Sequence, residues 1–284
     1  MTNRVRKAVF PVAGLGTRLL PATKTMPKEM LTIVDRPLIQ YAVDEAREAG
    51  IEQMIFVTGR GKSTLVDYFD TAFELEATLR DKGKSLDALA PSRAQIGEIV
   101  TVRQQQPLGL GHAVWCAREI VGDEPFAVIL PDDLMVPGAL KPMVEAWEKL
   151  GGNLVATEEV AADKTASYGI ITPGSTDGAV TEVRGLVEKP APDQAPSRLG
   201  VIGRYILQPQ VFAILDRGET GAGGEIQLTD AMARLIGEQP FHALKVDCVR
   251  HDCGDKAGFV IANLALALKH DDIGEKVRDA LSRL

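Results

Sequence analysis

Short apolar runs recur along the first half of the chain and alternate with longer amphipathic stretches. The runs are Ala8–Val12, Met54–Thr58, Ile99–Val102 and Phe126–Leu130. Runs of this length predict buried strands, and the amphipathic stretches between them predict helices. This alternation is typical of a parallel α/β sheet. The last run is apolar throughout, which predicts burial on both faces of the sheet.

Helical periodicity is clearest after Pro37, where we predict a helix that begins at this proline and ends at Gly50. Its apolar face consists of Leu38, Ile39, Ala42, Val43 and Ala46. Residues 62–82 predict a more polar helical stretch that buries Phe69, Phe73 and Leu75. A glycine turn at residues 109–111 predicts the entry to a helix over 112–120.

The second half of the chain changes character toward strands joined by turns. We predict strands at Leu154–Val160, Tyr168–Thr172, Ala179–Glu188 and Leu199–Leu207, with turns at Pro173-Gly174 and Asp177-Gly178. Residues from Ala257 onward predict a helical tail. The fold class is therefore α/β, with a Rossmann-like, mostly parallel but mixed central sheet flanked by helices, a β-hairpin extension and a C-terminal helical segment. We expect residues 1–284 to form a single domain.

Composition narrows the possible partners. The 284 residues carry a formal net charge of -7, and no basic tract offsets it, which argues against a nucleic-acid partner. No apolar run reaches the length of about 18 residues that a membrane span needs, and no signal peptide is evident. Three cysteines without a CxxC pair predict a reducing, cytoplasmic location without a disulfide framework.

The first predicted strand runs into a glycine-containing basic loop within Lys7–Leu31, KAVFPVAGLGTRLLPATKTMPKEML. Its turn contains Gly14 and Gly16, and the cations Arg18, Lys24 and Lys28 follow. Bare backbone N–H groups together with cations indicate a phosphate site. The loop lacks the Gly-x4-Gly-Lys-Ser/Thr pattern of a Walker A motif. It also does not match a dinucleotide fingerprint, because leucine stands where the third glycine of that fingerprint should be. We therefore expect it to wrap a polyanion.

Two carboxylates follow the most buried strand at once. Pro131 ends that strand, and Asp132 and Asp133 come next. Because ligands bind outside the carboxyl ends of strands in an open parallel sheet, the basic loop and the Asp pair belong to the same edge. Cations and carboxylates placed together are what a metal–triphosphate site requires.

The spaced pattern Gly-Leu-Gly-Thr-Arg-x-x-Pro-x-Thr-Lys-x-x-Pro-Lys-Glu resembles the signature of sugar-phosphate nucleotidylyltransferases. Later blocks resemble the uridylyl branch of that family, in order: Arg103-Gln104, Gly109–Ala113, Ile129–Asp132, Ser167–Gly169, Val187–Pro190, Gly203–Tyr205, Glu225–Asp230 and His251–Gly254. The resemblance covers nearly the whole chain. It implies transfer of the uridylyl group of UTP to α-D-glucose 1-phosphate, giving UDP-glucose and pyrophosphate. Residues 1–150 would be the nucleotide-binding half, 151–256 the sugar-binding half and 257–284 a helical tail.

The resemblance also implies roles for single residues. On the nucleotide side, Arg18 and Lys28 would hold the triphosphate, and the remaining nucleotide-binding residues would be Ala13, Gly14, Gly16, Glu29, Gln104 and Gly109. On the sugar side, Glu188 would bind the hydroxyls, Lys189 the phosphate, and Gly169 and Gly203 would line the pocket. Asp132 and Asp252 would hold Mg2+; whether Asp133 shares this role stays open. Relatives imply a homo-oligomer, a dimer or a tetramer.

Several alternatives remain at the level of sequence. Within the class, dTTP or another sugar phosphate could replace the expected substrates. A nucleotide-sugar-dependent glycosyltransferase also uses acidic metal ligands, but its donor has no γ-phosphate for the basic loop to bind. A non-catalytic nucleotide sensor would have no need of both the loop and Asp132. A zinc or thiol site at His251, Cys253 and Cys248 is a further alternative to a role for Asp252 in metal binding.

Overall fold

The apolar run nearest the N-terminus forms β1 (Lys7–Pro11), whose successive side chains point to opposite faces of a sheet. Ala8 and Phe10 pack into the hydrophobic cluster on one face, and Val9 packs into the cluster on the other. The structure is a computed structural model that describes residues 4–283. Burial on both faces explains why this strand is almost continuously apolar.

Eight further strands complete the central sheet. They are β4 (Gln53–Thr58), β5 (Ile99–Arg103), β6 (Phe126–Ile129), β8 (Asn153–Glu159), β9 (Gly169–Asp177), β10 (Val180–Glu188), β11 (Leu199–Leu207) and β12 (Phe241–Lys245). The strand order is β5-β4-β1-β6-β11-β8-β12-β10-β9. The strands of the first half are parallel, whereas β11 is antiparallel to β6 and β8, and β10 to β9 and β12. The predicted mixed α/β sheet is confirmed.

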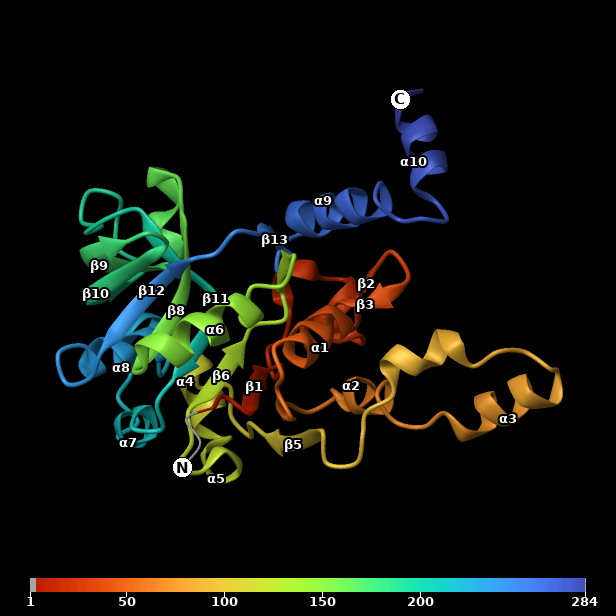
Figure 1. Cartoon of the computed structure of the whole chain (residues 1–284), viewed down its shortest axis with the longest axis horizontal. Coiled ribbons are helices and arrows are strands. Elements are labelled where there is room, and N and C mark those ends of the chain that lie inside the picture. Colours follow the sequence, from red (N-terminus) through yellow and green to blue (C-terminus); the bar gives the residue numbers. More distant parts are fainter. Residues whose placement is uncertain (1–3, 284) are drawn as a thin grey trace.

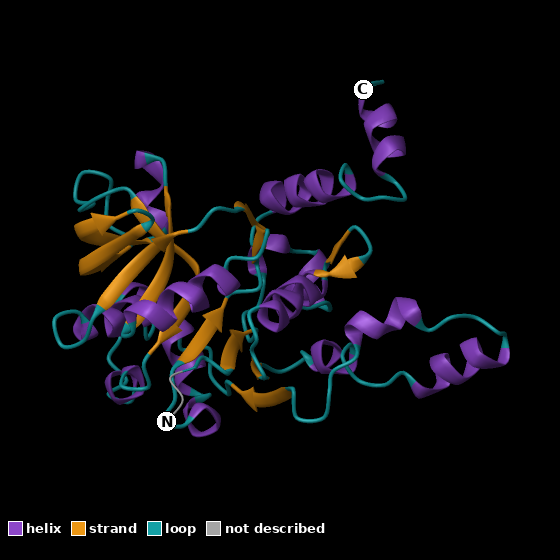
Figure 2. Cartoon of the chain, viewed as in Figure 1, coloured by secondary structure: helices purple, strands orange, loops and turns teal. Residues whose placement is uncertain are grey.

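Helices cover both faces of this sheet (Figures 1 and 2). One face packs against α1 (Leu38–Glu48) and α6 (Leu140–Leu150), through residues such as Ile39 and Trp147. The other face packs against α4 (Leu110–Trp115), α5 (Arg118–Val121), α7 (Val211–Leu215) and α8 (Leu228–Leu235). The predicted apolar face of α1 is buried at every position. Both core layers therefore hold the strand ends rigidly in place.

Two small ladders lie outside the main sheet. β2 (Thr32–Ile33) pairs with β3 (Arg36–Pro37), and β7 (Asp133–Val136) pairs with β13 (Val249–Asp252). The second ladder sets Asp252 opposite Asp133, although more than a hundred residues separate them in sequence. β13 then leads into α9 (Lys256–Ala267), whose N-cap Asp255 accepts a hydrogen bond of 2.9 Å from the Gly258 N–H. α10 (Gly274–Leu281) ends the predicted helical tail (Figure 1).

The polar stretch after β4 differs from its prediction. It forms two short helices, α2 (Ser63–Asp67) and α3 (Phe73–Asp81), and a 3-10 segment, η4 (Asp87–Ser92). Phe69 is buried as predicted, but Phe73 and Leu75 are 74% and 48% exposed. The reason is that α3 extends away from the sheet (Figure 1), so the sheet does not cover these two side chains.

Three smaller boundaries also differ. α1 begins at Leu38, because Pro37 belongs to β3 and has extended backbone angles. The helix predicted over 112–120 is divided into α4 and α5, with Ala117 between them. The turn predicted at Pro173-Gly174 lies inside β9, where a register shift in the pairing with β10 accommodates these residues. Within residues 4–283, the structure contains no helix long and apolar enough to cross a membrane.

Candidate active site

A cleft of about 650 Å³ lies where β6, β9, β10 and β11 meet the small β7–β13 ladder. Of the residues singled out from the sequence, its lining includes Arg18, Asp132, Gly169, Glu188, Lys189, Gly203 and Asp252. These residues come from both halves of the chain and lie up to more than two hundred positions apart. The fold therefore brings the predicted phosphate, metal and sugar residues to one cavity.

The basic loop reaches the cleft through Arg18 and contains three short 3-10 turns, η1 (Thr17–Leu19), η2 (Ala22–Lys24) and η3 (Lys28–Met30). Gly16 has a φ of 64°, in the left-handed region that favours glycine. Its carbonyl accepts a hydrogen bond of 2.7 Å from the Thr23 hydroxyl, and a Cβ there would lie 3.3 Å from that of Lys28. The glycine thus allows the loop to fold back and present its cations on one side.

Lys28 lies outside the cleft lining but contacts Asp132, which is part of it, with 2.5 Å between Nζ and Oδ2. Burial alone would lower the pKa of Lys28 and raise that of Asp132. The attraction between the two charges outweighs burial, so the pKa of Lys28 lies above its ordinary value and that of Asp132 below. Both groups are therefore charged at neutral pH.

Asp252 and Asp132 approach each other around Gly254. A Cβ on this glycine would lie 2.9 Å from Asp252 Oδ1, 3.2 Å from Asp132 Oδ2 and 3.7 Å from an Arg18 guanidinium nitrogen. The backbone fixes this arrangement, because the Cys253 N–H donates to the Asp132 carbonyl at 2.7 Å and the Gly254 N–H donates to Asp252 Oδ1 at 2.9 Å. Two carboxylates around a space without a side chain fit a hard divalent cation that takes its other ligands from phosphates and water.

Asp133 points elsewhere. Its Oδ2 accepts the Gly203 N–H at 3.0 Å, and its Oδ1 lies 2.6 Å from the Arg250 guanidinium. This agrees with the expectation that neighbouring side chains in extended chain point to opposite sides. Both aspartates line the cleft, but both carboxylate oxygens of Asp133 contact protein groups, whereas Lys28 contacts Oδ2 of Asp132.

The residues predicted to bind the sugar phosphate are two glycines and a charged pair, and all four line the cleft. A Cβ at Gly169 would lie 3.1 Å from Thr229 Oγ1, and one at Gly203 would lie 2.6 Å from Asp133 Oδ2. The Glu188 carboxylate is largely buried and lies 3.1 Å from Lys189 Nζ. Lys189 has a φ of 47°, which is uncommon for a residue with a side chain and occurs at functional sites.

Several predicted nucleotide residues lie beyond the cleft lining, at the neighbouring strand ends of β1, β4 and β5. Gln104 Nε2 donates to the Gly109 carbonyl at 3.0 Å and lies 3.0 Å from His112 Nδ1. Gly59 follows β4 directly, and a Cβ added to it would lie 3.2 Å from the Ala13 carbonyl oxygen. A Cβ added to Gly14 would lie 4.0 Å from the Lys28 side chain, so Gly14 lies close to one of the predicted phosphate-binding cations.

Glu29 is the predicted nucleotide residue whose surroundings differ most from an open pocket. Its carboxylate is fully buried and lies 2.8 Å from the Lys62 ammonium. Burial raises the pKa of Glu29, and Lys62 and Lys28 oppose that shift. Among the described residues, Glu29 Oε1 has no hydrogen-bond partner. Lys62 was not predicted as a site residue, because nothing in its local sequence signals a partner that lies 33 positions earlier.

The alternative at His251 and the cysteines finds no geometric support. In residues 4–283, no group of three or more His, Cys, Asp or Glu side chains could hold a metal ion. Burial raises the pKa of the Cys253 thiol to about 12 and that of Cys248 to about 11. Thiols that stay protonated at neutral pH are poor nucleophiles, so thiol catalysis is disfavoured.

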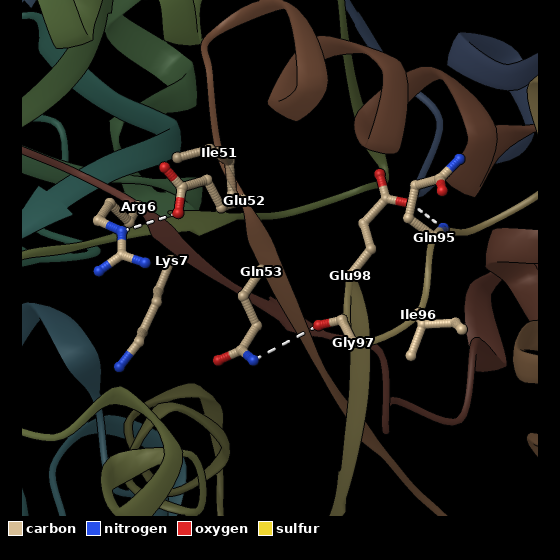
Figure 3. A pocket seen from close by; sticks show the side chains of 9 residues that line it. All are labelled: Arg6, Lys7, Ile51, Glu52, Gln53, Gln95, Ile96, Gly97 and Glu98. Carbon is tan, nitrogen blue, oxygen red and sulfur yellow. Dashed lines mark hydrogen bonds and ion pairs between the residues drawn. The ribbon is translucent and has the colours of Figure 1, made fainter.

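A second hollow of about 460 Å³ lies at the amino ends of β1, β4 and β5, away from the cleft (Figure 3). Its charged side chains already have protein partners: Arg6 Nε donates to Glu52 at 2.8 Å, and the Gln95 N–H donates to Glu98 at 2.7 Å. It contains none of the predicted site residues. Ligands of open α/β sheets bind at the opposite ends of the strands, so the cleft is the better candidate.

Comparison with known proteins agrees with this assignment. Residues 7–267 match the family model described as nucleotidyl transferase. The chain therefore belongs to the nucleotidyl transferase family. Over 260 aligned residues, the chain is 54% identical to the UTP–glucose-1-phosphate uridylyltransferase of Komagataeibacter xylinus. The alignment covers 90% of this chain and 92% of that protein.

Solved structures give the same picture. A UTP-bound UGPase from Acinetobacter baumannii is 41% identical, has a TM-score of 0.90 and covers 99% of both chains. A UDP-glucose pyrophosphorylase complexed with UDP-glucose is 44% identical, has a TM-score of 0.85 and covers 94% of this chain and all of that one (100%). The resemblance drawn from the sequence motifs is confirmed at the level of family and of relatives.

Proposed function

We propose that this chain transfers the uridylyl group of UTP to α-D-glucose 1-phosphate, giving UDP-glucose and pyrophosphate. One observation carries the proposal: a single cleft is lined by Arg18 and by the sugar-side pair Glu188 and Lys189, and Lys28 contacts its lining residue Asp132. The similar proteins named above are uridylyltransferases for glucose 1-phosphate, and solved relatives bind UTP and UDP-glucose. The arrangement fits both substrates of one transfer reaction.

The reaction is a direct displacement. A phosphate oxygen of glucose 1-phosphate attacks the α-phosphorus of UTP, the bond from this phosphorus to the bridging oxygen breaks, and pyrophosphate leaves with that electron pair. The attacking oxygen is already an anion, so no side chain has to become a covalent nucleophile. The protein contributes positioning and charge neutralisation. Arg18 and Lys28 neutralise the triphosphate, and Lys189 neutralises the sugar phosphate.

Enzymes of this family generally use a divalent metal. We assign Mg2+ to Asp132 and Asp252, whose carboxylate oxygens surround the space at Gly254. When bound, the ion would neutralise charge on the phosphates during transfer. Lys28, which neutralises Asp132 here, can then turn its ammonium toward the triphosphate.

The remaining predicted residues divide between the two substrates. Ala13, Gly14, Gly16, Gln104 and Gly109 supply backbone and amide groups to the uridine side, and Glu29 supports this region through its ion pair with Lys62. Backbone and amide groups can match the donors and acceptors of a pyrimidine edge. Gly169 and Gly203 leave room for the sugar, whose hydroxyls bind Glu188. The two halves, 1–150 and 151–256, act as one domain around the shared cleft.

Location and assembly complete the proposal. All three cysteines are free, which fits the reducing cytoplasm. We propose a homo-oligomer, a dimer or a tetramer, because α9 in the helical tail exposes the apolar side chains of Val260 and Ile261.

The direct test is pyrophosphate release across a panel of nucleotides and sugar 1-phosphates. We expect UTP with glucose 1-phosphate to have the highest kcat/KM. A preference for dTTP, ATP or CTP would overturn the substrate assignment and leave the chemistry standing. Transfer of the sugar from UDP-glucose to an acceptor, without formation or consumption of pyrophosphate, would favour the glycosyltransferase alternative.

A further inference from the structure

Arg250, on β13, lines the cleft and has a side chain that is 10% exposed. All of its guanidinium nitrogens contact protein groups. Nε and Nη2 lie 2.8 and 2.6 Å from Asp133 Oδ1, and Nη1 lies 2.6 Å from Glu158 and 3.0 Å from the Tyr168 hydroxyl. The guanidinium carbon is also 5.2 Å from the centre of the Tyr168 ring. Arg250 therefore connects β13, β7, β8 and the start of β9.

Two of these partners contact the sugar side of the cleft directly. The second carboxylate oxygen of Asp133 accepts the Gly203 N–H at 3.0 Å. The Tyr168 carbonyl accepts the Lys189 N–H at 2.9 Å, and this bond helps to hold Lys189 in its left-handed conformation. A sparsely populated conformation persists only where surrounding contacts determine it. Arg250 is thus connected to Lys189 through Tyr168 and to Gly203 through Asp133.

We propose that Arg250 is a positioning residue for glucose 1-phosphate, acting through Tyr168 on Lys189 and through Asp133 on Gly203. The inference rests on the proposed function, since it names which substrate side this residue serves. Although Arg250 lines the cleft, each of its guanidinium nitrogens already contacts Asp133, Glu158 or Tyr168, so we assign it a positioning role and not substrate binding. A planar guanidinium can meet three partners from fixed directions, whereas a lysine ammonium at the same place cannot.

Arg250→Lys tests this while keeping the charge. We expect the KM for glucose 1-phosphate to rise by about 10-fold to 100-fold, the range that a small misplacement of a binding group produces. The KM for UTP should change by less than about 3-fold, within the spread of single measurements of this kind. Arg198→Lys is the matched control, because Arg198 pairs with Glu159, next to Glu158, but is exposed. An equal rise in both KM values, or none, would overturn the proposal.

A double-mutant cycle separates action through Tyr168 from direct contact with substrate. Tyr168→Phe removes the hydroxyl that Nη1 contacts and keeps the ring. If Arg250 acts through Tyr168, the effects of Arg250→Lys and Tyr168→Phe on the KM for glucose 1-phosphate will be less than additive. Fully additive effects would contradict the proposed route.

Hydrogen exchange of the free protein gives a readout that does not depend on activity. In Arg250→Lys, the amide of Lys189 should exchange faster than in the parent, while amides in the β1–β4 ladder stay protected. Unchanged exchange at Lys189 would contradict the positioning role whatever the substrates are. If the parent makes no UDP-glucose from UTP, the proposed function fails, but the exchange result still reports whether Arg250 holds Lys189.

Discussion

The contact between Lys28 and Asp132 holds a cation next to the cleft, where we propose that it neutralises the triphosphate. Its distance of 2.5 Å and its partial burial mean that this charge is held in place and only partly screened by water. A donor of this kind, aimed at phosphates that gain charge as the bond breaks, acts mainly on the transition state. Arg18 lies on the same side, 3.7 Å from the point where a Cβ on Gly254 would be.

Replacing Arg18 or Lys28 by alanine should therefore lower kcat by about 100-fold, since one missing charge donor costs about 3 kcal/mol. The KM for glucose 1-phosphate should change little, because neither side chain is among the residues predicted to bind the sugar phosphate. Steady-state kinetics with both substrates varied would measure this. Lys82→Ala, which alters an exposed lysine at the end of α3, serves as the control. Turnover within a few-fold of the parent for both variants would contradict the assigned role.

At the scale of elements, the β7–β13 ladder gives the neighbouring carboxylates of Asp132 and Asp133 different surroundings. It places Asp252 beside Asp132 at Gly254 and turns Asp133 toward Gly203 and Arg250. The two adjacent aspartates both line the cleft but have different protein partners, and we assign the metal to Asp132.

Asp132→Asn should abolish most metal-dependent turnover and weaken Mn2+ binding in the presence of UTP, because it removes one of two carboxylate ligands. Asp133→Asn should leave Mn2+ binding near that of the parent and act on the sugar side through Arg250. A metal titration of both variants, followed by electron paramagnetic resonance of Mn2+, compares them. Loss of Mn2+ binding in Asp133→Asn alone would show that the metal ligand is one residue further along.

A second element-scale feature is a buried ion pair that joins α1, α6 and β11. Glu45 lies 2.6 Å from Arg204 and also accepts the N–H groups of Ala139 and Leu140, at 2.9 Å each, where α6 begins. Both side chains of the pair are almost fully buried. Removing one partner would leave an unpaired charge in the core.

Glu45→Ala should lower the free energy of unfolding by about 3–5 kcal/mol, as expected when one member of a buried ion pair is lost. Glu48→Ala, on the exposed side of the same helix, should change it by less than about 0.5 kcal/mol. Urea denaturation followed by circular dichroism measures both variants. Similar midpoints for the two would show that the pair contributes little.

At the scale of the whole molecule, the apolar pattern of the sequence predicts those strands and helix faces that depend on local periodicity. The strand at Phe126–Ile129 and the buried face of α1 follow from apolar spacing, and the cleft's place follows from the rule for strand ends. Patterns do not reveal Arg250, Lys62 or the Glu45–Arg204 pair, because each depends on a partner far away in sequence. Phe73 shows the converse limit, since an apolar residue is buried only where another element covers it.

The molecule as a whole is acidic, with a formal net charge of -7, and the cleft is lined by both cations and carboxylates. We therefore expect a polyanionic nucleotide to bind through individual cations such as Arg18 and not through a net positive field. We propose that the uridylyl group passes directly from UTP to the sugar phosphate in this cleft, without a covalent protein intermediate.

Isotope exchange between labelled pyrophosphate and UTP tests this claim most directly. With Mg2+ and UTP but without glucose 1-phosphate, we predict no exchange above that of a control without enzyme, because no bond to the α-phosphorus breaks until the sugar phosphate attacks. Adding glucose 1-phosphate should start exchange together with formation of UDP-glucose. Exchange at a comparable rate in the absence of the sugar phosphate would reveal a uridylyl–enzyme intermediate and contradict the account.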